Sequence, residues 1–316
     1  MNGKEINLSG PDVKKWYPLP EIINEQVNEN LWLIDRLVPA KSLSTLVGPS
    51  DTGKSTFSKQ LGMAIASGST EFLGLRIFEN NQKVLYVSTE DSKAVVRAVH
   101  TKQLRRGAGQ GTENFFYMFD MEGLSSINDF LNEYEPSLII IDTWSDTFNG
   151  NPNDWAAVRK NLNGLTKIIR KHGCSILMLH HNVKNSERFG PNKNLLNGSQ
   201  SIEAKSRSVF ELRNGNKDNE RMLTIVKNNQ LPNDIKHTSM LLELDTETLL
   251  FSKNGETSSN AVTQISSRYD RELWLKRYRD ISAESMSISE VIEELILAYP
   301  NEEVPKKTWF SENLRG

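Results

Sequence analysis

The eight residues from Gly48 to Ser55 constrain the fold of this chain more than any other feature of its sequence. They read Gly-Pro-Ser-Asp-Thr-Gly-Lys-Ser and match G-x-x-x-x-G-K-[ST], in which a strand ends, a turn follows and a helix begins. The turn points backbone N–H groups inward, and the helix N-terminus adds the positive end of its dipole. A chance match in 316 residues has a probability on the order of 1%. The pattern therefore predicts a loop that cradles phosphates.

Two side chains of this loop have predicted roles of their own. Lys54 is expected to reach the β- and γ-phosphates as a mobile point charge, and the Ser55 hydroxyl is expected to ligate Mg²⁺. The cofactors implied are a nucleoside triphosphate, taken as ATP, and Mg²⁺. The candidate nucleotide-binding residues are Gly48, Pro49, Ser50, Asp51, Thr52, Gly53, Lys54, Ser55 and Thr56.

Short apolar runs alternate with helical patterns from residue 31 onward. Helices are predicted at 54–66 and 155–171, and such alternation is typical of βαβ units with a mostly parallel sheet covered on both faces. The predicted strands are 43–47, 84–87, 137–141, 175–179 and 208–212. Three further strands, at 222–226, 239–244 and 248–251, have short polar connections with no room for a helix, so they should pair antiparallel at one edge of the sheet. The predicted fold class is α/β.

The same patterns divide the chain into four parts. They predict an N-terminal arm at 1–30, a nucleotide-binding domain at 31–252, a polar linker at 253–263 and a small helical C-terminal module at 264–316. Helices are expected in the last part at 268–279, 287–298 and 305–314.

The composition excludes several classes of protein. Lys and Arg number 38 against 40 Asp and Glu, a net charge of −2, which excludes a histone-like protein but allows a local basic patch. The lone cysteine, Cys174, excludes an intrachain disulfide and a cysteine-rich zinc site, and is expected to be buried. The strongest apolar run, 138–141, is far short of the roughly 20 residues that a membrane helix needs. We expect a soluble cytoplasmic protein with no membrane partner.

Further candidate residues follow the ends of the predicted strands. Asp142 follows the strand at 137–141, beside the phosphate loop, where a carboxylate can hold the Mg²⁺ shell; a turn-forming aspartate is the alternative. Glu90 is a candidate base that orients the attacking water, and the sequence separates it only weakly from Asp91, which could instead cap a helix. His180 and His181 end the strand at 175–179. His181 is a candidate sensor of the γ-phosphate, and no nearby Asp, Glu, Cys or third His completes a metal site with the pair.

Lys205 and Arg207 precede the strand at 208–212. Their cationic ends could neutralise phosphate charge in a transition state, but for a bare K-x-R pair two solvated surface charges are the more common explanation, and only the resemblance described below favours the first role.

Together, these motifs resemble the RecA-type P-loop ATPases, and most closely the RepA-like hexameric replicative helicases. The resemblance spans about residues 31–252. The segments that carry it are 32–39, the phosphate loop, 84–91, 139–143, 179–181, Gly198-Ser199 with Lys205 and Arg207, and 226–228. Only the phosphate loop is specific by itself, but the order and spacing of the whole set are distinctive.

The resemblance implies a sheet of strand order 5-1-4-3-2, counted over the five parallel strands. It implies Glu90 as the catalytic carboxylate, Asp142 as the acid of the Mg²⁺ site and His181 at the position that senses the γ-phosphate. Lys205 and Arg207 match a finger that enters the site of the neighbouring subunit in ring-forming members. The protein would then be a homo-oligomer, a hexamer by analogy, and one chain alone should be a poor ATPase.

Two segments match the loops that line the central channel of such rings, at 143–154 and 182–197. The second carries Lys184, Arg188, Phe189 and Lys193, cations with an aromatic residue among them, which suits single-stranded DNA; a flexible solvated loop is the alternative. The window 181–230 has 9 Lys or Arg against 5 Asp or Glu. Trp144 and Trp155 are expected to be packing residues rather than platforms for bases.

The C-terminal module resembles the opening of a helix-turn-helix. Residues 261–316 carry 8 Lys or Arg against 10 Asp or Glu, which disfavours binding to duplex DNA and favours an oligomerisation or partner-binding role.

The main hypothesis is a ring-forming, Mg²⁺-dependent ATPase that translocates on or unwinds single-stranded DNA in the replication of a mobile element, with a replication or loading partner possible. The alternative is a nucleotide-switched assembly or regulatory ATPase that unwinds nothing.

Overall fold

A computed structural model describes residues 16, 18–24, 30–78, 81–106, 111–119, 121–148, 150–151, 154–181, 191, 200–236, 238–258, 271–282, 286–300, 302 and 304–314. Internal contacts divide the chain into two units, residues 1–31 and 32–316. The first unit contains the short helix α1 (Leu19–Asn24), which the sequence patterns did not predict.

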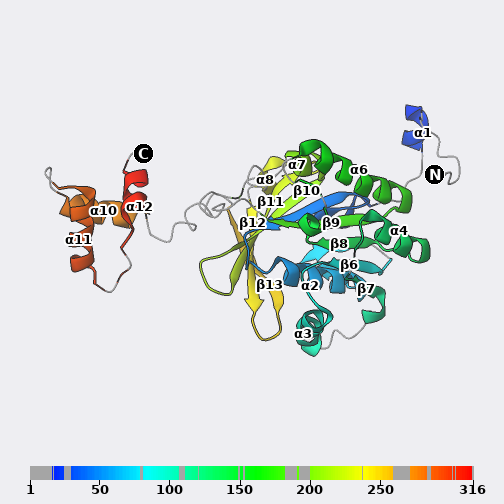
Figure 1. Cartoon of the computed structure of the whole chain (residues 1–316), viewed down its shortest axis with the longest axis horizontal. Coiled ribbons are helices and arrows are strands. Elements are labelled where there is room, and N and C mark those ends of the chain that lie inside the picture. The colour runs from blue at the N-terminus through cyan, green and yellow to red at the C-terminus, as the bar shows by residue number, and fades with distance from the viewer. Residues whose placement is uncertain are drawn as a thin grey trace. The chain divides into compact units, whose positions relative to one another are not determined.

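Among the described residues, nine strands form one central sheet (Figure 1). In spatial order they are β13 (Leu250–Ser258), β12 (Thr238–Asp245), β11 (Glu220–Asn228), β10 (Ser208–Asn214), β3 (Leu43–Gly48), β9 (Ser175–His181), β8 (Leu138–Asp142), β6 (Val84–Ser88) and β7 (Phe115–Met118). The run from β10 to β7 is parallel, and β10 to β13 are antiparallel. The predicted order 5-1-4-3-2 is confirmed as β10-β3-β9-β8-β6.

The helices complete the fold. In the second unit they are α2 (Lys54–Ala66), α3 (Lys93–Gln103), α4 (Leu124–Glu133), α5 (Trp144–Thr147), α6 (Trp155–His172), α7 (Gln200–Lys205), α8 (Asn233–Lys236), α10 (Arg271–Ile281), α11 (Ile288–Ala298) and α12 (Lys307–Asn313), with 3₁₀ turns at Leu104–Arg106 and Thr112–Asn114. Two small hairpins pair β1 (Trp32–Ile34) with β2 (Val38–Pro39) and β4 (Glu71–Phe72) with β5 (Leu75–Arg76). None of the helices in the described part of the chain has the length and apolar content needed to cross a bilayer.

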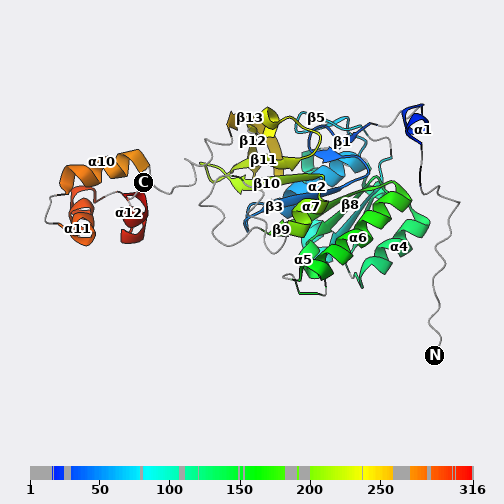
Figure 2. The ribbon, with the colours of Figure 1, turned by 90° about the horizontal axis from the view of Figure 1, so that it is seen from above.

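Helices cover both faces of the sheet, as the predicted α/β class requires (Figures 1 and 2). One apolar cluster joins Phe57 and Leu61 of α2 to the strands, and the other joins α4, α6 and α7 to the opposite face. β8 is buried at every position, which is the pattern of a parallel strand with both faces covered.

The helix α6 shows why these sequences form these elements. Asp154 caps its N-terminus, because its carboxylate accepts the backbone N–H groups of Ala156 and Ala157. Gly173 ends it in a left-handed conformation (φ 67°). Between the caps, one stripe of apolar residues is buried against the sheet: Val158, Leu162, Leu165, Ile168 and Ile169.

The structure corrects several expectations about the elements. β13 runs to Ser258, so residues 253–258 of the predicted linker form an edge strand with β12. Backbone hydrogen bonds sustain an edge strand whose side chains are polar and exposed, so hydropathy did not reveal it. The strand β7 was not predicted. A short helix, α8, lies between β11 and β12, where none was expected, and α5 occupies part of the predicted loop at 143–154.

Candidate nucleotide-binding site

The phosphate-binding loop connects β3 to α2, as its sequence predicts. A side chain at Gly48 is impossible there, because a Cβ atom would lie 2.2 Å from the backbone oxygen of Leu212 in β10. Gly53 stands at the N-cap of α2 with φ 88°, a left-handed conformation that favours glycine. The loop backbone therefore passes close to its neighbour strand and turns sharply into the helix N-terminus, which is the arrangement that binds phosphate.

Lys54 occupies the centre of the loop. Its Nζ donates hydrogen bonds to the backbone oxygens of Gly48 (3.0 Å) and Pro49 (2.7 Å), and the residue is only 7% exposed. Burial lowers the pKa of this ammonium, while Asp142, Glu90 and, more weakly, Asp51 raise it. Three carboxylates thus face the cation that is predicted to bind the phosphates.

The other loop residues surround this centre. The Thr52 hydroxyl donates to the Pro49 oxygen at 3.0 Å, and the Thr52 oxygen accepts from Arg221 Nε of β11 at 3.0 Å. Ser50 and Asp51 are exposed at the tip, and Ser55 and Thr56 are half-buried in the first turn of α2. The sequence patterns did not single out Arg221, because it lies in β11, 169 residues away from Thr52.

Asp142 ends β8 with a buried carboxylate, 4% exposed. Its Oδ2 accepts the hydroxyl of Tyr86 at 2.5 Å and lies 4.0 Å from Lys59 Nζ. Its Oδ1 has no hydrogen-bond partner among the described residues, although it is buried. A buried, unpartnered carboxylate oxygen beside a phosphate loop fits the ligand shell of Mg²⁺, which prefers oxygen donors.

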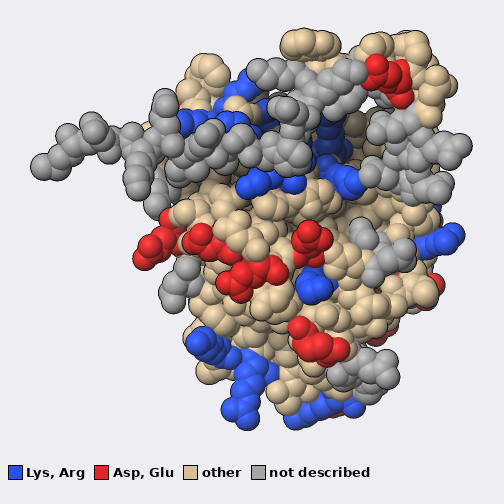
Figure 3. Space-filling view, turned by 90° about the vertical axis from the view of Figure 1, so that its right-hand side faces the viewer, with Lys and Arg blue, Asp and Glu red and all other residues tan. Residues whose placement is uncertain are grey.

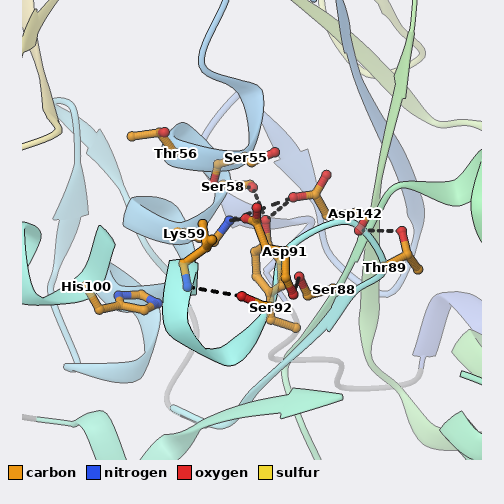
Figure 4. Close-up of polar contacts among 12 residues, drawn as sticks. Ser55, Thr56, Ser58, Lys59, Ser88, Thr89, Asp91, Ser92, His100 and Asp142 are labelled. Carbon is orange, nitrogen blue, oxygen red and sulfur yellow. Dashed lines mark hydrogen bonds and ion pairs between the residues drawn. The ribbon is translucent and has the colours of Figure 1, made fainter. Parts of the chain in front are cut away.

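Glu90 and Asp91 follow β6 and have different surroundings. Asp91 Oδ2 accepts a hydrogen bond from Lys59 Nζ at 2.9 Å (Figure 4). Glu90 has no ion pair with the described part of the chain. Burial, followed by Asp142 and Asp146, raises the pKa of Glu90. Ser92, rather than Asp91, caps α3 by accepting the backbone N–H of Val95. The structure therefore gives different surroundings to two carboxylates between which the sequence only weakly favours Glu90.

His181 lies beside the phosphate loop, since it pairs with Gly48 in the β3–β9 register. Its side chain is half-buried, and burial and Lys54 lower its pKa while Asp142 raises it. His180 points the other way and is buried with its ring 5.6 Å from that of Trp144. Of the histidine pair, His181 is the one that faces the charges of the site.

Lys205 and Arg207 lie at the opposite end of the strands from the loop. Lys205 ends α7, and Arg207, an exposed residue, donates its backbone N–H to Leu43 at the start of β3 (2.7 Å). Both line a hollow of about 330 Å³ between α6 and α7. Its other cationic lining residues are Lys41, Arg159 and Arg170, and the lining contains no acidic residue from the described part of the chain. The structure does not bring this pair to its own phosphate loop.

The predicted DNA-contacting residues Lys184, Arg188, Phe189 and Lys193 lie outside the described residues. Of the two tryptophans, Trp144 is buried and stacks on Phe148 with ring centroids 5.1 Å apart, whereas Trp155 is 67% exposed. The packing role expected for Trp155 is therefore wrong, because its side chain is exposed at the first residue of α6. Figure 3 shows side chains of both charge signs on one face of the molecule, with acidic residues gathered across its middle.

The sequence patterns did not single out two further residues of the site. Lys59 of α2 is 1% exposed, and Tyr86 of β6 is fully buried; both contact Asp142. Burial, Asp142 and a hydrogen bond to it raise the pKa of Tyr86 well above its usual value. α2 buries most of its length, so a charged residue on its inner side has no distinguishing periodicity.

Comparison with known proteins identifies a family and shows similarity to solved structures. A family model described as "AAA domain" matches residues 21–187, which is more than half of the chain. No curated protein matches. Among solved structures, the chain is similar to one titled "Crystal structure of the RadB recombinase", with 16% identity and a TM-score of 0.48 over 69% of this chain and 93% of that one.

Proposed function

The chain belongs to the AAA domain family, and from that premise we propose that it is a Mg²⁺-dependent ATPase of the RecA fold whose nucleotide is hydrolysed between two copies of the chain. The P-loop, the α/β fold and the strand order support nucleotide binding by this domain. The central part of the proposal is that one copy supplies residues to the nucleotide site of another.

The residues around the loop would take distinct roles. Backbone N–H groups from Gly48 to Thr56 and the Lys54 ammonium would bind the phosphates. The Ser55 hydroxyl and Asp142 Oδ1 would hold Mg²⁺, which supplies charge neutralisation across the β- and γ-phosphates. Glu90 would orient and deprotonate the attacking water, and its raised pKa suits a base that works near neutral pH. His181 would respond to the γ-phosphate.

The location of Lys205 and Arg207 is the observation that carries the proposal. Ser208 of β10 pairs with Ser44, near the start of β3, whereas Gly48 ends that strand. At about 3.3 Å per residue, roughly 13 Å of buried strand separates the two ends. The exposed Arg207 guanidinium therefore faces away from its own loop, in a basic hollow without a carboxylate from the described residues. A cation in that position is suited to the nucleotide of an adjacent copy.

The second part of the proposal concerns the movement that ATP hydrolysis would drive. We infer a ring, hexameric by resemblance to RepA-like helicases, that translocates on single-stranded DNA during replication of a mobile element. Lys184, Arg188, Phe189 and Lys193 are the candidate DNA contacts. A loading or replication partner is compatible with the helical C-terminal module proposed at 264–316. The second candidate function, a nucleotide-switched assembly or regulatory ATPase, shares the same site and differs only in what hydrolysis drives.

The test of the shared site uses two variants that should fail for different reasons. Lys54→Ala removes phosphate binding, and Arg207→Ala should bind nucleotide but lose about 10³-fold or more in hydrolysis rate, since an arginine supplied in trans contributes that much. Co-expressed together, the two should recover part of the wild-type rate, because some interfaces combine an intact loop with an intact Arg207. The exposed Arg97→Ala of α3 is the matched control. Wild-type turnover by Arg207→Ala alone would contradict the proposal.

A single-stranded oligonucleotide separates the two candidate functions. A motor should hydrolyse ATP faster with the oligonucleotide and displace a strand from a forked substrate, and Lys54→Ala should abolish both. An ATPase rate that does not change when DNA is added, together with assembly that depends on nucleotide, would favour the nucleotide-switched assembly or regulatory ATPase.

A further inference from the structure

Lys59 carries the most deeply buried ammonium of the site. Its side chain is 1% exposed and projects inward from α2, one helical turn beyond the phosphate loop. A buried cation is costly unless charged and hydrogen-bonding partners surround it. The partners of Lys59 therefore indicate what this residue does.

Three groups surround the Lys59 ammonium. Its Nζ lies 2.9 Å from Asp91 Oδ2, 4.0 Å from Asp142 Oδ2 and 5.0 Å from the centroid of the Tyr86 ring. Figure 4 shows the side chain pointing from α2 toward the two carboxylates. One cation thus joins the ends of β6 and β8, the two strands whose carboxylates are the candidates for catalysis and metal binding.

Both contacts on Asp142 fall on the same oxygen. The Tyr86 hydroxyl donates to Oδ2 at 2.5 Å, and Ser58 of α2 contacts that hydroxyl at 3.0 Å. Lys59 approaches Oδ2 as well, so Oδ1 is the buried oxygen left without a partner among the described residues. The two donors fix the rotation of the carboxylate and determine which of its oxygens is available.

We propose that Lys59 is a positioning residue of the ATPase. It locks Asp142 with Oδ1 presented to Mg²⁺, and it holds Asp91 away from the reacting water, so that Glu90 alone can serve as the base. This inference rests on the proposed nucleotide site and adds to it a residue that touches neither nucleotide nor metal. Groups that orient a metal ligand without touching the metal commonly contribute about 10–100-fold to metal affinity.

The experiment measures binding rather than turnover. The dissociation constant of a fluorescent ADP analogue is determined in excess Mg²⁺ and in excess EDTA. The constant in EDTA divided by the constant in Mg²⁺ reports how much the metal contributes to binding. Lys59→Met, which keeps the length of the side chain without its charge, should reduce that ratio about 10-fold or more. The constant in EDTA should stay near the wild-type value, because the loop backbone and Lys54 are unchanged. Lys167→Met, an exposed lysine of α6, is the matched control.

A second variant keeps the test decisive if Lys59→Met fails to fold. Tyr86→Phe removes only the hydroxyl on Asp142 Oδ2 and should lower the ratio in the same direction by a smaller factor. A wild-type ratio in a folded Lys59→Met, or in Tyr86→Phe when Lys59→Met does not fold, would overturn the inference, even if the melting temperature falls. A wild-type protein whose affinity does not respond to Mg²⁺ would instead count against the proposed metal site itself.

Discussion

Glu90 and Asp91 are neighbours in the chain, yet their carboxylates are suited to different tasks. Asp91 is held by the buried Lys59 at 2.9 Å. Glu90 has no such ion pair with the described residues, and its pKa is raised by burial and by Asp142. A base must accept a proton and release it again, so the carboxylate without an ion pair is the better candidate.

Glu90→Gln should therefore stop hydrolysis while nucleotide binding persists. The loss expected for a general base is about 10²–10⁴-fold in kcat. In the wild type, the raised pKa means that the base becomes protonated at a higher pH than an ordinary glutamate, so kcat/KM should fall on the acid side earlier than for a carboxylate in water. Single-turnover rates across pH check both points. Asp91→Asn is the comparison, and it should lower the melting temperature with hydrolysis largely retained. The reverse result would exchange the two roles.

The sequence identified candidate residues where backbone spacing defines them, and it missed residues that are recognised only by contacts through space. Gly48 to Ser55 can be recognised in the sequence because a turn and a helix N-terminus fix their spacing. Lys59, Tyr86 and Arg221 could not be found in this way. Their roles come from three elements that meet only after the sheet has formed.

At the scale of elements, the edge beyond β6 is built by β7 and α3. β7 was missed because its run of four apolar and aromatic residues, Phe115–Met118, is too short to be told from a buried helix segment by periodicity. Tyr117 of β7 lies with its hydroxyl 2.6 Å from His100 Nε2 of α3. The ring of Phe115 packs edge-to-face on the same imidazole. Burial, with a smaller effect of Lys59, lowers the pKa of His100 to about 4.

This histidine should make the protein sensitive to acid. Between pH 6.5 and about 4, His100 binds a proton in the unfolded chain but stays neutral in the folded protein. The stability of the fold therefore decreases as the pH falls through this window, and the contribution of neutral His100 is fully present above it. The contribution is at most about 3 kcal/mol. His100→Gln should lose less stability than the wild type between pH 7 and pH 5, as measured by melting temperature. Parallel melting curves for the two proteins would show that His100 does not cause the effect.

The buried parallel strands were the clearest to predict, although parts of the less buried β11, β12 and β13 were predicted as well. β3, β8 and β9 have apolar runs because both of their faces are covered, and their order followed from the resemblance rather than from hydropathy. The polar extension of β13 could not be predicted, since an edge strand is held by its backbone ladder.

At the scale of the whole molecule, the C-terminal helices have an apolar cluster of their own. It consists of Trp274, Tyr278, Val291, Leu295 and Phe310, with partly buried neighbours from residues 281–309, whereas the clusters of the sheet draw on residues 33–251. Separate cores are expected of parts that can be removed independently.

A chain that ends at Ser258 should therefore keep the nucleotide site. Its affinity for the ADP analogue and its melting transition should match those of the sheet domain in the full chain. Assembly measured by mass, or binding to single-stranded DNA, should change if the helical module takes part in either. Loss of nucleotide binding on truncation would contradict a division of the chain after Ser258.

The separation of the phosphate loop and Arg207 along the same strands has a consequence for stoichiometry. Surfaces at opposite ends of one body join head to tail, and a two-fold dimer cannot satisfy both. In an open row of copies, the terminal member always has one nucleotide without a donor, so a row has one working site fewer than it has members. Closing the row supplies the missing site, and short assemblies gain the most in proportion. Specific activity should accordingly rise with the size of the assembly and level off once the circle is complete.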